Sequence, residues 1–98
     1  MPIHVLALSV DLRLVDSHSL KDKRSVIRTI LEGAKRRFVV AAAETDHQDE
    51  WQRSELAFCA VSSSAGIVTK VLDDVERFVW SFPEVEVLST ERHWLETD

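Results

Sequence analysis

The stretch HVLALSVDLRL, residues 4–14, alternates large apolar side chains with smaller or polar ones. The large apolar residues occupy the even positions: Leu6, Leu8, Val10, Leu12 and Leu14. Successive residues of a β-strand point to opposite faces, so this period of two places all five on one face. The stretch therefore predicts a strand with one face in a hydrophobic core and the other face outside it.

A helix is predicted to follow this strand, with Ser19 as its N-cap. Ser19 and Asp22 have the spacing of a capping box, with Asp in place of the usual Glu. Apolar residues then recur on one helical stripe, at Val26, Ile27, Ile30, Leu31 and Ala34. Gly33 inside the helix costs about 1 kcal/mol relative to alanine, which indicates a close contact at that position.

The rest of the chain adds three strands and a second helix. Residues 38–45 and 54–62 are predicted to form an antiparallel hairpin, because too few residues separate them for a parallel crossover. Residues 65–82 carry a helical apolar stripe that Pro83 ends, and residues 85–94 form a last strand. The order β-α-β-β-α-β predicts an α+β, ferredoxin-like sandwich, with a four-stranded antiparallel sheet and both helices on one face.

Composition indicates one ordinary globular domain. The chain has 98 residues, of which 45% are hydrophobic and 30% charged, so we expect a single domain over residues 1–98. Cys59 is the one cysteine and lies in an apolar run, which predicts a buried free thiol in a reducing compartment. The first residues lack the basic leader of a signal peptide, and no stretch approaches the roughly 18 apolar residues of a membrane span. These features predict a cytoplasmic protein.

Because both helices are expected on one face of the sheet, the other face is left uncovered. Small apolar side chains should lie there: Val5, Ala7, Ala57 and Cys59. Monomeric proteins rarely leave several hundred Å² of contiguous apolar surface in water, so we predict a homodimer with these residues in its interface. None of them is aromatic, so the base stacking used by RNA-recognition motifs across the open sheet face is not expected.

Charge is unevenly distributed along the chain. Residues 17–37 hold seven basic and two acidic residues, a net charge of +5, whereas the whole chain carries −5 and the remainder therefore −10. At about 100° per residue, four cations of the first helix fall within an arc of about 60°: Lys21, Arg24, Arg28 and Lys35. Such a row suits the phosphates of a nucleic acid. An ordinary solvated helix face is the alternative.

The connection between the hairpin strands, ETDHQDEWQRSEL at residues 44–56, is rich in functional side chains and contains no glycine. Asp46, His47 and Asp49 suit a metal or acid–base site by residue type. However, three ligands within four residues do not converge easily, which favours a structural role in the turn.

Trp51 and Arg53 fall on the same side of the following strand. They suit either stacking on a planar group or locking the hairpin to its neighbour, and the sequence does not decide between these roles.

Two motifs, HSLKDKR at residues 18–24 and DHQDEWQR at residues 46–53, give the chain a clear resemblance. It resembles the YlxP-like family, catalogued as domain of unknown function family 503, from Ile3 to about Leu95. The resemblance implies a ferredoxin-like fold in small bacterial cytoplasmic proteins, often encoded beside transcription and translation factors, and no established activity. The matched residues are Ser19, Leu20, Lys21, Lys23, Arg24, Asp46, His47, Gln48, Asp49, Trp51, Gln52 and Arg53. Glu50 departs from the family, where an apolar residue is more usual, and any apolar contact made by that position is therefore in doubt.

We therefore predict a non-enzymatic, RNA- or ribosome-associated binding module. The predicted contact residues are Lys21, Lys23, Arg24, Arg28, Lys35, Asp46, His47, Gln48, Trp51 and Arg53. The second hypothesis is a homodimeric regulatory domain that binds a protein or a small ligand through the apolar sheet face or a dimer groove. An enzyme ranks third, since no paired nucleophile and base can be recognised, and neither a cofactor nor a metal ion is expected.

Overall fold

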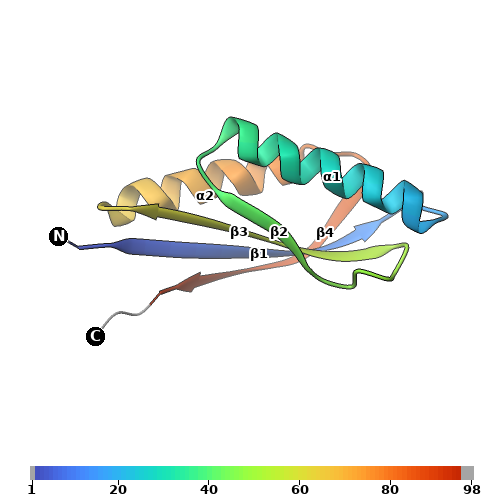
Figure 1. Cartoon of the computed structure of the whole chain (residues 1–98), viewed down its shortest axis with the longest axis horizontal. Coiled ribbons are helices and arrows are strands. Elements are labelled where there is room, and N and C mark those ends of the chain that lie inside the picture. Colours follow the sequence, from blue (N-terminus) through green and yellow to red (C-terminus); the bar gives the residue numbers. More distant parts are fainter. Residues whose placement is uncertain (1, 96–98) are drawn as a thin grey trace.

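The computed structural model of the chain describes residues 2–95 and has the element order predicted from the sequence (Figure 1). The elements are β1 (His4–Leu14), α1 (Leu20–Arg37), β2 (Ala41–Asp46), β3 (Arg53–Ser62), α2 (Ala65–Trp80) and β4 (Val85–Trp94). The strands pair antiparallel in one sheet, in the order β2-β3-β1-β4. Figure 1 shows both helices on one face of this sheet, and none of the described elements covers the other face. The predicted ferredoxin-like sandwich is confirmed.

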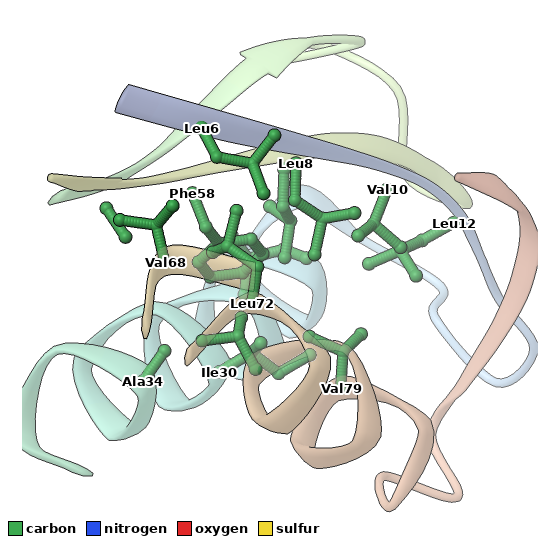
Figure 2. Packing of buried hydrophobic residues seen from close by; sticks show 14 of the residues in the cluster. Leu6, Leu8, Val10, Leu12, Ile30, Ala34, Phe58, Val68, Leu72 and Val79 are labelled. Carbon is green, nitrogen blue, oxygen red and sulfur yellow. The ribbon is translucent and has the colours of Figure 1, made fainter. Parts of the chain in front are cut away.

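The hydrophobic core lies between the sheet and the two helices (Figure 2). The even positions of β1 are almost completely buried, as the alternation predicts, with Leu8, Val10 and Leu12 at 0% exposure. The other elements add Leu56, Phe58 and Ala60 from β3, Ile27, Ile30 and Ala34 from α1, and Val68, Leu72, Val75 and Val79 from α2. Within residues 2–95, neither helix combines the length and the apolar character needed to cross a bilayer.

The structure corrects four predicted element boundaries. β2 begins at Ala41 rather than residue 38, because Phe38 is the C-cap of α1 and packs edge-on against Phe78 at a centroid distance of 5.9 Å. β2 ends one residue later than predicted, at Asp46, β3 begins one residue earlier, at Arg53, and α2 ends at Trp80 rather than residue 82. Phe38 and Phe82 pack against the core, so their apolar side chains fit the pattern of an element that does not include their backbone.

Two local predictions for α1 are confirmed. Ser19 is the N-cap, and its hydroxyl accepts a hydrogen bond from the Asp22 amide at 3.0 Å. The Asp22 carboxylate accepts from the His18 amide, one residue before the position that a standard capping box uses. Gly33 marks the close approach of the two helices, since a Cβ atom there would lie 2.7 Å from the ring of Phe78.

Candidate binding surface on helix α1 and the adjoining loop

Helix α1 carries the unpaired positive charge of the structure. In the part of the chain that the structure describes, the cations without a carboxylate within 4.0 Å are Lys21, Arg24, Arg28, Arg36 and Arg37. All five lie on α1, and all are exposed. The guanidinium of Arg37 lies over the ring of Phe78, 4.9 Å from its centroid, so its environment differs from that of the others.

We call the row formed by Lys21, Arg24, Arg28 and Lys35 the basic face. Its members are exposed, as predicted, and the row lies beside the apolar stripe of α1, since Arg24 and Arg28 adjoin Ile27 and Leu31. With a rise of about 1.5 Å per residue, the row extends over about 21 Å. Lys35 is the member with an acidic partner, Glu32, at 3.1 Å. A surface pair of this kind is weak, so Lys35 remains accessible to an anion.

Helix α2 shows the opposite pattern, because its cations have acidic partners. Lys70 and Arg77 both contact the Asp74 carboxylate, at 3.2 and 3.0 Å. The hydrogen bond from Lys70, followed by the charges of Lys70 and Arg77, lowers the pKa of Asp74. Arg92 of β4 likewise pairs with Asp73 and Glu76, at 2.8 and 3.3 Å. The chain is therefore electrostatically polarised, with open positive charge on α1 and compensated charge on α2.

Lys23 does not lie with the other predicted contact residues. Its side chain is 1% exposed, and its Nζ lies 2.9 Å from Oε2 of Glu44 and donates a hydrogen bond to the His47 carbonyl oxygen. The same Glu44 oxygen accepts a hydrogen bond from the Ser54 hydroxyl at 2.6 Å. We call this group of Lys23, Glu44, Ser54 and the His47 carbonyl the Lys23 junction. Because Lys23 is buried there, it is not available to an external phosphate, and the prediction that it is a contact residue is corrected.

The predicted loop residues connect the two sequence motifs to each other. His47 has a positive φ of 62°, a conformation that directs its carbonyl to Lys23. The Nδ1 atom of His47 lies 2.7 Å from Oε2 of Glu50, so Glu50 forms an ion pair with His47 when the imidazole is protonated. Gln52 donates to the carbonyl oxygen of Ser17 at 3.2 Å. The loop is therefore attached to the start of α1, which supports a structural role for its inner residues.

Other loop side chains face the solvent beside the start of α1. Asp46, Gln48 and Asp49 are exposed, and Trp51 is 54% exposed. Asp46 accepts a hydrogen bond from the His47 amide at 2.7 Å, which is a turn-capping contact. Across residues 2–95, no three His, Cys, Asp or Glu side chains are grouped so as to hold a metal ion.

Arg53 lies on the open face of the sheet, on the side away from the helices. Its Nη2 contacts both carboxylate oxygens of Asp11, at 3.0 and 2.9 Å, and Asp11 is on the neighbouring strand β1. Its Nε is buried and has no hydrogen-bond partner among residues 2–95. The whole thickness of the sheet therefore separates Arg53 from the basic face, and the two cannot contact one phosphate together.

The predicted interface residues lie together on the open face. Ala7 is opposite Cys59 in the β1–β3 register, with Val5 and Ala57 one pleat away on either side. All four are half-buried in the single chain, so the expected burial of the Cys59 thiol is only partial. Ala41 and Ala43, which were not among the predicted residues, extend this surface onto β2. A run of three alanines has no alternation that would reveal which of them face outward.

Comparisons with known proteins identify the family of the chain and agree with its fold. A family model described as "Protein of unknown function (DUF503)" matches residues 5–92. The uncharacterized protein YlxP of Bacillus subtilis (strain 168) is 41% identical over 81 residues, which cover 83% of this chain and 88% of that protein. The de novo designed protein Foldit4 is similar in fold alone, with a TM-score of 0.57, 14% identity, and coverage of 99% of this chain and 100% of the designed one. The chain belongs to the DUF503 family of proteins of unknown function.

Proposed function

We propose that this protein binds structured RNA through the phosphate backbone, with Lys21, Arg24 and Arg28 as the central contacts and Lys35 and Arg36 beside them. The observation that supports this proposal is the location of the unpaired cations of residues 2–95, all of which are on α1. Phosphate contacts need regularly placed cations that are not already neutralised. We place this binding in the cytoplasm, either on free RNA or on RNA associated with the ribosome.

The net charge of −5 argues against non-specific binding of nucleic acids over the whole protein surface. It is compatible with one oriented contact. The acidic residues Asp73, Asp74 and Glu76 lie on α2 and are close to cations of their own. The residues outside 17–37 nevertheless carry a net charge of −10, so an RNA that docks on the basic face is attracted by α1 and repelled by the rest of the surface, which selects one orientation.

The test is a comparison of two charge-matched double variants by fluorescence anisotropy, with a labelled RNA hairpin over a series of salt concentrations. Arg24→Ala/Arg28→Ala should weaken binding about tenfold or more at low salt and reduce the slope of log K against log salt by about 1 to 2. Lys70→Ala/Arg77→Ala removes the same charge from α2 and should leave the slope unchanged. Equal losses in both variants, or no binding by the native protein at low salt, would contradict the proposal.

A second function is favoured by the apolar end of the open sheet face, where Val5, Ala7, Ala57 and Cys59 lie together. The opposite end of this face is covered by the pairs Arg53–Asp11 and Arg13–Glu86. We infer that the apolar end is the interface of a homodimer, in which two copies of the same patch meet, and that it gives the protein a second docking function.

Light scattering at micromolar concentration tests the dimer. Ala57→Glu buries a charge in the inferred interface and should yield monomers. Ser89→Glu introduces the same charge on the polar end of the open face, next to Asp11, and should leave the dimer intact. A native protein that is monomeric at micromolar concentration would exclude this second function.

A further inference from the structure

A groove of about 250 Å³ lies between α1 and β2, immediately beside the basic face. Glu44 lines it from the sheet, and the residues that line it from the helix are Lys23, Arg24, Ile27, Arg28, Leu31 and Glu32. The groove thus combines cations, apolar side chains and two carboxylates. Glu32 pairs with Lys35, and Glu44 pairs with Lys23, so neither arginine neutralises a carboxylate of the groove within the described chain.

The chemistry of Glu44 distinguishes the groove from an ordinary surface hollow. Its side chain is 20% exposed. Both of its polar contacts, with Lys23 and Ser54, use Oε2. Within residues 2–95, no side chain donates a hydrogen bond to Oε1. The groove therefore contains a fixed carboxylate oxygen that can accept a hydrogen bond from a ligand.

We propose that this groove binds an unpaired nucleobase that carries an exocyclic amino group. The amino group donates to Oε1 of Glu44, the base packs against Leu31 and the exposed edge of Ile27, and the adjoining phosphates lie on Arg24 and Arg28. This inference rests on the proposed RNA-binding function and adds to it a preference among bases. A carboxylate is acceptor-only and pairs well with the amino group of cytosine.

Cytosine and uracil form a matched pair for this site. The two bases have similar size. They differ at C4, where cytosine has an amino donor and uracil a carbonyl acceptor, and at N3, where uracil has its one N–H donor between two carbonyl groups. A carboxylate accepts readily from the cytosine amino group, whereas at the uracil N3–H it also meets two carbonyl oxygens that repel it. The basic face alone does not distinguish the two bases, because RNA oligomers of cytosine and of uracil have the same phosphate backbone.

The experiment measures binding of 12-nucleotide oligo(rC) and oligo(rU) to the native chain by anisotropy, over a salt series. We expect oligo(rC) to bind about five- to tenfold more tightly, with the same salt slope as oligo(rU). Leu31→Trp fills the groove without changing charge, and it should abolish the preference while leaving oligo(rU) affinity unchanged. Thr29→Trp adds the same bulk to an exposed position on the far side of the basic face and should keep the preference.

A second measurement does not depend on either variant or on backbone contacts. Titration of the native protein with CMP should shift the methyl NMR signals of Ile27 and Leu31, and UMP should shift them much less. Equal binding of the two oligomers with a normal salt slope would contradict the proposed base site and leave the proposed RNA-binding function standing. Failure of both oligomers to bind at low salt would contradict the RNA-binding function. In that case, equal responses to CMP and UMP would contradict the base site as well.

Discussion

Lys21 and Lys23 are two residues apart in α1 and have opposite environments. Lys21 is exposed on the basic face and has no acidic partner within residues 2–95. Lys23 is 1% exposed and is enclosed in the Lys23 junction, where it connects α1 to β2 and to the loop. Two residues correspond to about 200° around a helix, so neighbours at this spacing face opposite ways. The comparison shows that one basic motif supplies both a structural cation and a candidate binding cation.

The largest effect is expected from removal of the buried member of this pair. Lys23→Ala leaves the carboxylate of Glu44 largely buried without its cation and removes a donor from the His47 carbonyl. We expect the free energy of unfolding to fall by about 3 kcal/mol, measured by chemical denaturation. Lys21→Ala is the control and should change it by less than about 0.5 kcal/mol.

A double variant sharpens this prediction. In Lys23→Met/Glu44→Gln, neither member of the pair retains a charge, so the loss of stability should be clearly smaller than in Lys23→Ala. If the double variant is less stable than the single one, the Lys23 junction is held by something other than the ion pair.

The next largest effect on stability is expected at His47, whose backbone carbonyl is part of the Lys23 junction. His47→Ala keeps the left-handed conformation at φ 62° and loses the contact with Glu50, and should cost about 1 kcal/mol. His47→Gly loses the same contact but relieves the conformational strain, so it should be close to native in thermal stability. Equal losses in the two variants would mean that the imidazole, and not the backbone conformation, organises the loop.

Substitution of Gly33 tests how tightly α1 packs against α2 at a position without charge. Alanine is the better helix former by about 1 kcal/mol, but its Cβ would approach the Phe78 ring to 2.7 Å. Phe78 also contacts Phe38 and Phe82, so it has little freedom to move away. We expect Gly33→Ala to lower stability by about 1 kcal/mol net, and thermal unfolding of Thr29→Ala, on the exposed side, provides the control.

The smallest effect is expected on α2, where charges are paired at the surface. The hydrogen bond from Lys70 lowers the pKa of Asp74, so the ionised carboxylate stabilises the folded state above the ordinary pKa, and this contribution is lost as pH falls through the lowered value. Asp74→Asn should therefore flatten the dependence of Tm on pH below about pH 4 and leave RNA binding unchanged. An identical pH profile for both proteins would show that this ion pair is not formed in solution.

The fold could be predicted from local sequence patterns, because those patterns depend directly on which side chains are buried. The alternation over residues 4–14 and the stripes at helical spacing each select one buried face, and Ser19 and Gly33 reported a cap and a close contact. Errors were confined to boundaries. There, core packing by a residue such as Phe38 imitates the apolar pattern of a strand.

The candidate site was only partly readable. Helical spacing was sufficient to place Lys21, Arg24, Arg28 and Lys35 on one exposed side, since angular position depends on sequence separation alone. The partner of each charge is set by residues far away in the chain. Glu44, which accepts a hydrogen bond from Ser54, neutralises Lys23, and Asp11 pairs with Arg53. The groove at Glu44 exists because α1 packs over β2.

The sequence by itself thus determined the order of the elements, the buried faces and the position of the basic residues around α1. Only the tertiary structure decided which of those charges are neutralised and which remain open. The physical reason is that periodicity is a property of neighbours along the chain, whereas desolvation and ion pairing depend on residues that folding brings together from separate elements.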